Sequence, residues 1–152
     1  MESLHPLVVH FPIALLLSAL VFELAALVVK QPTLHRVSLW NLSLGTMAAG
    51  AAVFTGLRAE EMAKHSFEIW QVMGLHERLG ITTFILSLIV TVWRWRKRDQ
   101  LTRRARAVTL AAMLAIATTV SVGGYLGGRL VYEFGVGGKF GAPHGVSPAN
   151  RP

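Results

Sequence analysis

The sequence predicts an all-α protein, a four-helix transmembrane bundle with both termini on the outer, periplasmic side. Composition is the first observation: of 152 residues 53% are hydrophobic and only 15% are charged, against roughly 25% charged in soluble globular domains. The second is that the apolar residues form four long runs. Each run can cross about 30 Å of hydrocarbon at about 1.5 Å per residue. This pattern excludes a soluble enzyme with a packed aqueous core.

The first two runs lie in the N-terminal half of the chain. Residues 7–29 form the first, which ends at Lys30, Gln31 and Pro32. No basic segment precedes it and Glu2 stands there instead, so we interpret it as a retained helix rather than a cleavable signal peptide. Residues 39–57 form the second, with no charge and many small side chains. Such small residues predict a face that packs closely against other helices.

The third run has its apolar core at residues 79–93 and is expected to begin near Gly74, and the fourth covers residues 107–126. Between the second and third, residues 58–73 mix apolar and charged side chains, which favours an amphipathic helix lying in the membrane interface. The end of the chain is rich in Gly and Pro. We therefore expect a transmembrane domain over residues 1–134 and a flexible tail over residues 135–152.

The positive charge is concentrated in one segment. The chain has 15 Lys and Arg against 8 Asp and Glu, and seven of the basic residues lie between Arg94 and Arg106 beside a single acid, Asp99. A basic segment between two apolar runs is typical of a cytoplasmic loop, and nucleic-acid binding is not needed to explain it. The charges thus predict a multi-pass membrane protein with both termini outside the cytoplasm.

Several kinds of chemistry have no support in the sequence. There are no cysteines, which excludes disulfides, iron–sulfur clusters and covalent haem attachment through CxxCH. No nucleophile–base set, phosphate-binding Gly-rich loop or HExxH motif is found. We therefore assign no catalytic residues and expect an electron carrier at most, not a hydrolase or transferase.

Unusual residues from different helices reach one depth when residues are counted from the cytoplasmic ends. His10 stands 20 residues from Lys30, and His76 stands 18 residues from Arg94, which is about 30 Å and about 27 Å along a helix. Neutral histidine is the commonest protein ligand for transition metals and also ligates haem iron. His10 and His76 are therefore predicted to be the two axial ligands of a haem b near the outer face.

Other residues at that depth complete the predicted site. Gly80, Gly124 and Gly128 would leave room for the macrocycle. Arg58 and Arg129 would pair with its propionates. His5 would lie at the rim of the site or support a ligand. Three alternatives stay open. The glycines also fit GxxxG helix packing, the arginines also fit interfacial residues, and the three histidines could instead hold copper or zinc, or no cofactor at all.

Glu23 is the one acid within an apolar run. It stands seven residues before Lys30, about 10 Å into the bilayer, where a carboxyl is costly. One interpretation is a protonated carboxyl bonded to Asn41, Ser43 or another polar group across the bundle. The other is a proton relay.

Three segments of the chain resemble a family of bacterial membrane proteins. They are LHPLVVHFPIAL at residues 4–15, GLHERLG at residues 74–80 and GGYLGGRLVYEFGVG at residues 123–137. With them the chain resembles the DUF2231 family. The resemblance implies a four-helix inner-membrane protein in a redox setting, because the family often accompanies cytochrome or redox modules, and His5, His10 and His76 are the histidines within its motifs.

These observations favour a cytochrome b-like electron-transfer protein with bis-histidine haem. Its expected partners are the lipid bilayer, quinol and a respiratory or photosynthetic membrane complex. Two alternatives are an accessory structural subunit of such a complex and a membrane protein that binds a metal ion through histidines without haem.

Overall fold

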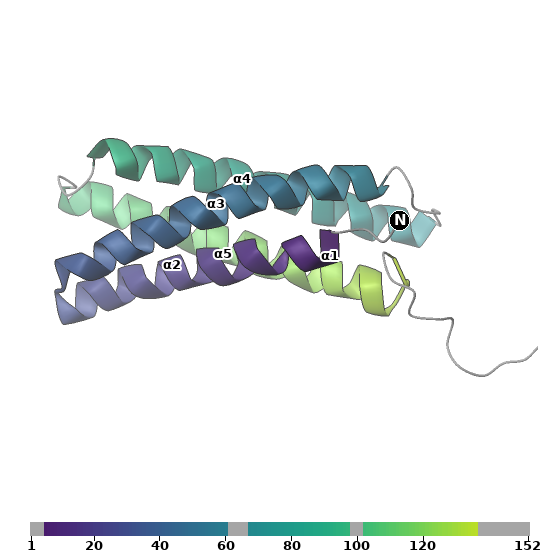
Figure 1. Ribbon diagram of the computed structural model, residues 1–152, viewed down its shortest axis with the longest axis horizontal. Helices are drawn as coiled ribbons and strands as arrows, with labels where there is room; N and C mark the ends of the chain where they lie inside the picture. The colour runs from purple at the N-terminus through teal and green to yellow at the C-terminus, as the bar shows by residue number, and fades with distance from the viewer. Residues whose placement is uncertain (1–4, 61–66, 98–101, 137–152) are drawn as a thin grey trace, which may run out of the picture.

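The computed structural model describes residues 5–60, 67–97 and 102–136, and all of its regular structure there is helical (Figure 1). Its helices are α1 (His5–Val8), α2 (His10–Val29), α3 (Pro32–Glu60), α4 (Phe67–Lys97) and α5 (Arg103–Tyr132). The four longer ones are long and apolar enough to cross a membrane. The predicted set of four transmembrane helices is therefore confirmed.

The four long helices form a closed ring. Contacts join α2 to α3, α3 to α4, α4 to α5, and α5 back to α2. In Figure 1, α1 and the C-terminal end of α5 lie at the same end of the bundle. The helices therefore run alternately up and down, as in bundles whose successive helices are joined by short connections. We call the end with α1 the histidine end and the opposite end, where α4 finishes, the basic end.

The connection between α2 and α3 is a two-residue turn. Lys30 adopts left-handed backbone angles, φ 57° and ψ 35°, and Pro32 opens α3. A left-handed residue commonly ends a helix, and proline suits a first helical position because its missing N–H has no partner there. Arg36, expected in a loop, therefore lies in the second turn of α3.

The predicted interfacial helix over residues 58–73 is wrong where the structure describes that segment. Residues 58–60 continue α3, and residues 67–73 form the first two turns of α4. Met73 in these turns is 7% exposed. One side of this part of α4 therefore faces the interior of the bundle. Residues 61–66 and nearly all of the predicted tail at residues 135–152 lie outside the described residues.

A break at Val9 separates α1 from α2. Val9 is a turn residue between the two helices, and Pro12 follows within the first turn of α2. A proline four residues after Val8 cannot donate to the Val8 carbonyl, and its ring crowds that oxygen. Val9 keeps right-handed helical angles, φ −63° and ψ −22°, and α1 packs against α3.

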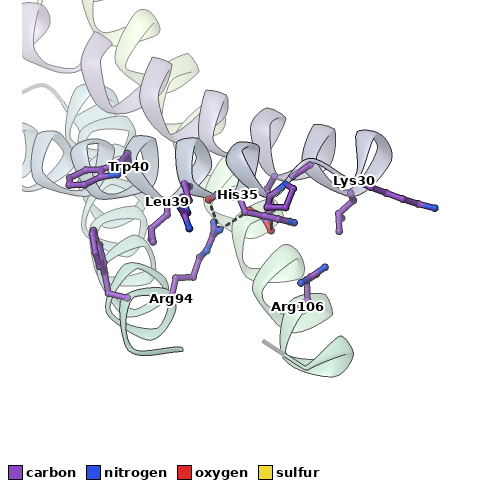
Figure 2. Close-up of a pocket in the computed structure, with 12 residues that line it drawn as sticks. Lys30, His35, Leu39, Trp40, Arg94 and Arg106 are labelled. Carbon is purple, nitrogen blue, oxygen red and sulfur yellow. Dashed lines mark hydrogen bonds and ion pairs between the residues drawn. The ribbon is translucent and has the colours of Figure 1, made fainter. Parts of the chain in front are cut away.

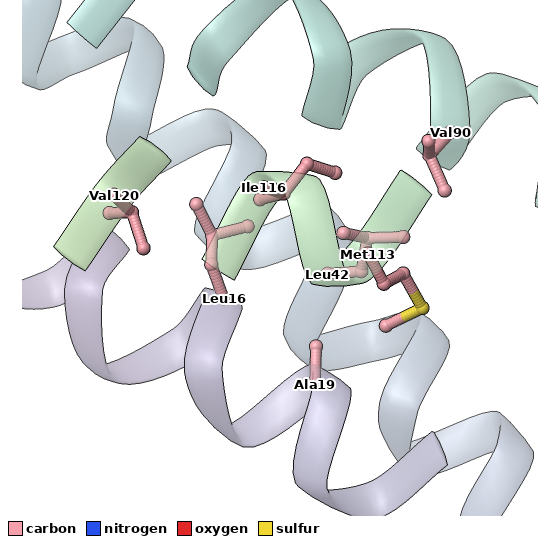
Figure 3. Packing of buried hydrophobic residues seen from close by; sticks show 7 residues of the cluster. All are labelled: Leu16, Ala19, Leu42, Val90, Met113, Ile116 and Val120. Atoms are coloured by element: carbon pink, nitrogen blue, oxygen red, sulfur yellow. The ribbon is translucent and has the colours of Figure 1, made fainter. Parts of the chain in front are cut away.

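The core draws on all four long helices. Leu16, Ala19, Leu42, Val90, Met113, Ile116 and Val120 are buried together at its centre (Figure 3). A Cβ added to Gly45 would lie 2.8 Å from the Leu16 side chain, so Leu16 occupies space that this glycine leaves. Gly50 meets Phe84 in the same way, at 3.0 Å. These contacts confirm the predicted packing face of residues 39–57.

Large apolar side chains also cover the outside of the bundle. Val28 is 81% exposed, Met47 72% and Phe54 62%. Side chains of this kind are stable against lipid, and helices satisfy their own backbone groups there. The outer surface is therefore suited to contact with the bilayer.

Candidate functional site

A cavity of about 430 Å³ lies at the histidine end of the bundle. Six of the eight residues predicted for the cofactor site are among the residues that line it, namely His5, His10, His76, Gly80, Gly124 and Gly128. The remaining two predicted residues, Arg58 and Arg129, do not line it. The structure thus brings together the three histidines and the three glycines, which come from four helices, but not the arginines.

The rings of His5 and His76 lie close together in the lining of this cavity, in an edge-on arrangement. Their centroids are 6.0 Å apart and their planes meet at 83°. Nδ1 of His76 lies 2.8 Å from the carbonyl oxygen of Gly123. A carbonyl only accepts, so Nδ1 carries the proton and Nε2 keeps a lone pair.

His5 is held in the same tautomer through Thr55. The Thr55 hydroxyl donates to the carbonyls of Ala51 and Ala52, at 3.0 and 3.1 Å, and Nδ1 of His5 lies 3.2 Å from its oxygen. Because the single hydroxyl proton is directed at those carbonyls, the oxygen accepts from the His5 Nδ1–H. Burial, and then the neighbouring His76, lower the pKa of His5. In the neutral form of each ring, Nε2 is therefore the nitrogen that carries the lone pair.

Two glycines make room for these rings. A Cβ on Gly56 would lie 3.0 Å from Cε1 of His5, and a Cβ on Gly127 would lie 3.0 Å from Cε1 of His76. Gly56 belongs to the small-residue face of residues 39–57, and Gly127 to the glycine-rich segment of α5. Each lets the Cε1 edge of an imidazole approach a helix backbone.

The three predicted glycines differ from one another. A Cβ on Gly80 or Gly128 would meet nothing within 4 Å, whereas one on Gly124 would lie 3.2 Å from Ile13. Gly80 and Gly128 thus border open space, and Gly124 allows α5 to approach α2. Open space and close helix packing, the two explanations that the sequence allows for these glycines, therefore occur at different positions.

His10, Arg58 and Arg129 have surroundings that the depth count did not foresee. His10 lines the cavity but is exposed, and the ring set against His76 belongs to His5. The Arg58 guanidinium lies 5.6 Å from the centre of the Phe54 ring. Arg129 is paired with Glu133, one turn further along α5, at 2.8 Å.

A second polar cluster lies near the basic end and is centred on Glu23. The Glu23 side chain is 2% exposed, and its Oε2 lies 2.8 Å from Nη2 of Arg94. Its Oε1 accepts from Nδ1 of His35 at 3.0 Å. Arg94 also donates to the Ser38 hydroxyl at 2.9 Å and to the His35 carbonyl at 3.1 Å. One arginine of α4 is thereby bonded to both α2 and α3.

The expected partners of Glu23, Asn41 and Ser43, are wrong. Asn41 donates to the Val37 carbonyl at 2.9 Å, and Ser43 accepts from the indole N–H of Trp95 at 2.9 Å. Arg94 had been counted only among the basic residues of the cytoplasmic loop. A signal for its burial was present, because it continues a series of buried polar residues along one side of α4, namely Thr83, Ser87, Thr91 and Arg94.

A second cavity, of about 750 Å³, opens beside this cluster. Figure 2 shows Arg94 reaching toward His35 on α3, with Arg106 on the neighbouring α5. This cavity lies at the opposite end of the bundle from His5 and His76.

Comparison with known proteins gives one match. A sequence profile described as a predicted membrane protein, DUF2231, matches residues 1–139. That range contains every described helix and all three histidines of the cavity. No curated protein and no solved structure matches the chain.

Proposed function

This chain belongs to the DUF2231 family of predicted membrane proteins, and on that premise we propose that it is a membrane redox protein that binds one haem b through His5 and His76. Haem supplies one-electron chemistry at its iron. The protein residues hold it, orient it and shield it from water. The proposal keeps the haem predicted from sequence and replaces His10 with His5 as the partner of His76.

The short distance between the imidazoles of His5 and His76 is the observation that carries this proposal. Haem occupies four iron positions with its own nitrogens and needs only two axial donors from the protein. With metal–nitrogen bonds of about 2 Å on either side of one ion, two ring centres are expected about 6 Å apart. The separation of the His5 and His76 centroids, 6.0 Å, agrees with that value.

The hydrogen bonds behind the two rings support the same assignment. Metal-binding histidines usually donate their other N–H to a carbonyl, carboxylate or water, which fixes the tautomer and the ring orientation. His76 does so to the Gly123 carbonyl and His5 to the Thr55 hydroxyl. Both Nε2 atoms are thereby left to bind iron.

The number of donors favours haem over a bare metal ion. Over residues 5–60, 67–97 and 102–136, no group of three or more His, Cys, Asp and Glu is close enough to hold a metal. Zinc sites use three or four protein ligands. A two-donor site therefore suits a cofactor that brings its own nitrogens better than copper or zinc alone.

The cavity has the character of a cofactor site. Its volume of about 430 Å³ falls within the roughly 300–1,000 Å³ of known ligand pockets. Ile13, Val120 and Leu130 are among its apolar lining residues, and Gly80 and Gly128 border open space. Quinol or a membrane redox complex would be the electron donor.

Larger side chains on the open side of the cavity test whether haem occupies it. Gly128→Leu and Gly80→Leu are each expected to lower the haem retained on purification about tenfold, because the new side chain would occupy ligand volume. Gly74→Leu is the matched control, since a Cβ there also meets nothing within 4 Å but Gly74 does not line the cavity. The measurement is haem per chain from the Soret absorbance. Equal retention in all three variants would show that this space holds no macrocycle.

We also propose that the protein lies in the bacterial inner membrane with its histidine end outside the cytoplasm. The basic residues at the other end support this orientation. A reporter active only outside the cytoplasm is expected to work when fused to either terminus and to be inactive when inserted at Asp99. Activity at Asp99 with none at the termini would reverse the orientation.

A further inference from the structure

The cavity at the basic end carries a marked excess of positive charge. Four cationic side chains line it, Lys30, Arg36, Arg94 and Arg106, against a single carboxylate among its described lining residues, Glu23. Glu23 is already paired with Arg94 at 2.8 Å. Among the described lining residues, Lys30 and Arg106 therefore add positive charge beyond that of the Arg94–Glu23 pair.

Hydrogen bonds within the protein hold Arg94 in place at the floor of this cavity. The Arg94 side chain is 5% exposed, and its hydrogen bonds to Ser38 and to the His35 carbonyl fix its position. Ser38 in turn donates to the Ala19 carbonyl at 2.8 Å. Figure 2 shows Arg106 on the α5 side of Arg94 and Lys30 at the end of α2.

One wall of the cavity is aromatic. Trp40 and Trp95 meet edge to face with ring centroids 5.4 Å apart, and Trp95 is tied to Ser43 by its indole N–H. Trp40 is 58% exposed on the outside of the bundle. Exposed tryptophan is favoured at the level of lipid headgroups. Cations and a lipid-facing apolar wall thus border the same space.

We propose that this cavity binds the phosphate headgroup of an anionic phospholipid. Lys30 and Arg106 contact the phosphate, Arg94 holds the floor beneath it, and the Trp40–Trp95 wall lies along the glycerol and upper acyl chains. Basic pockets between transmembrane helices bind anionic headgroups in this way. The proposal does not depend on the haem site at the other end. Free phosphate carries the same charge but has no apolar part for the tryptophan wall.

Retention of lipid by the purified full-length protein tests the proposal. The protein is exchanged in detergent with phosphatidylglycerol or phosphatidylcholine, and bound lipid is counted by native mass spectrometry. Wild type is expected to retain about tenfold more phosphatidylglycerol than phosphatidylcholine. The variant Lys30→Asn with Arg106→Gln is expected to retain about tenfold less phosphatidylglycerol than wild type, which abolishes the preference over phosphatidylcholine, because both cations near the anionic headgroup are removed. Asparagine is chosen because it tolerates the left-handed angles of Lys30.

The matched control removes the same charge from the same end of the bundle. Arg103→Gln with Arg104→Gln leaves the cavity lining unchanged and is expected to retain phosphatidylglycerol as wild type does. Equal loss in the control, or equal retention of the two lipids by wild type, overturns the proposal. So does complete displacement of phosphatidylglycerol by about 10 mM inorganic phosphate, because phosphate alone would then suffice. If helix content shows that the double variant does not fold, Arg106→Gln alone is read against Arg104→Gln.

Discussion

Replacing His76 with alanine is expected to abolish the low-spin haem spectrum. The substitution removes the imidazole that the Gly123 carbonyl holds in place and leaves the iron with one axial donor at most. His5→Ala is expected to do the same from the other side. Helix content is expected to be unchanged in both variants, because helices in lipid satisfy their own backbone groups. Absorption spectra and circular dichroism of the purified variants make the measurement.

His10→Ala is the matched control for this pair. His10 lines the same cavity, but its ring is not the one set against His76, so its removal is expected to leave the low-spin spectrum in place. Reasoning from the sequence alone assigned the reverse roles to His5 and His10. A lost spectrum in His10→Ala with a retained one in His5→Ala would restore that earlier assignment.

Thr55→Val refines the test without removing a ligand. It deletes the hydroxyl that lies 3.2 Å from Nδ1 of His5 and keeps the shape of the side chain. Loss of such a supporting hydrogen bond typically weakens metal binding about 10–100-fold. Weaker haem retention with an unchanged spectrum is the expected signature of a group that positions a ligand.

Breaking the Glu23–Arg94 pair is expected to cause the largest loss of stability. Arg94→Met leaves the Glu23 carboxylate, 2% exposed, without its cation, and Glu23→Met leaves the buried guanidinium without its anion. Removing one member of a buried pair typically costs about 3–5 kcal/mol of unfolding free energy. Replacing both members is often nearly neutral, so the double variant is expected to lose much less than the sum of the single losses.

Reversible unfolding in mixed micelles measures this double-mutant cycle. Arg96→Gln is the control, since Arg96 lies on the same helix but is exposed, and a change within about 0.5 kcal/mol is expected. Single variants that lose less than about 1 kcal/mol would contradict the structural role of the pair. Haem content is expected to be unaffected, because Glu23 stands 13 residues from His10, about 20 Å along a helix.

The spans and the cavity depth could be read from the sequence because both depend on distance along a helix. The rise per residue is constant, so counting residues from the basic end carries His10, His76 and the α5 glycines to one level. Lipid also demands long apolar runs, which are visible without any alignment. These predictions need no knowledge of how a helix is rotated about its axis.

Contacts that depend on helix breaks or rotation were not accessible in that way. The count treated residues 7–29 as one helix and placed His5 outside it, whereas His5 begins α1 and lies against Gly56 of α3. Pro12 was the available signal, since a proline crowds the carbonyl four residues before it. The ion pair of Arg129 with Glu133 also had a signal, because opposite charges four residues apart lie on one helix face.

The burial of Arg94 could not be predicted from the sequence for a different reason. Its place among seven basic residues suggested a loop function, and net charge cannot distinguish a buried arginine from its exposed neighbours. Only the partner on another helix, Glu23, makes burial of that charge possible. The buried acid was visible as unusual in the sequence, but its pairing with Arg94 joins α2 to α4, two helices that are not neighbours in the ring.

The absorption spectrum of the purified wild-type protein, recorded oxidised and after reduction with dithionite, tests the central proposal most directly. Protein expressed with an adequate haem supply is expected to show a sharp α-band on reduction, as two imidazole ligands on low-spin iron require. Absence of that band from a folded, helical protein would contradict haem binding by His5 and His76. Metal analysis of the same sample would then separate a metal-ion site from a purely structural membrane subunit.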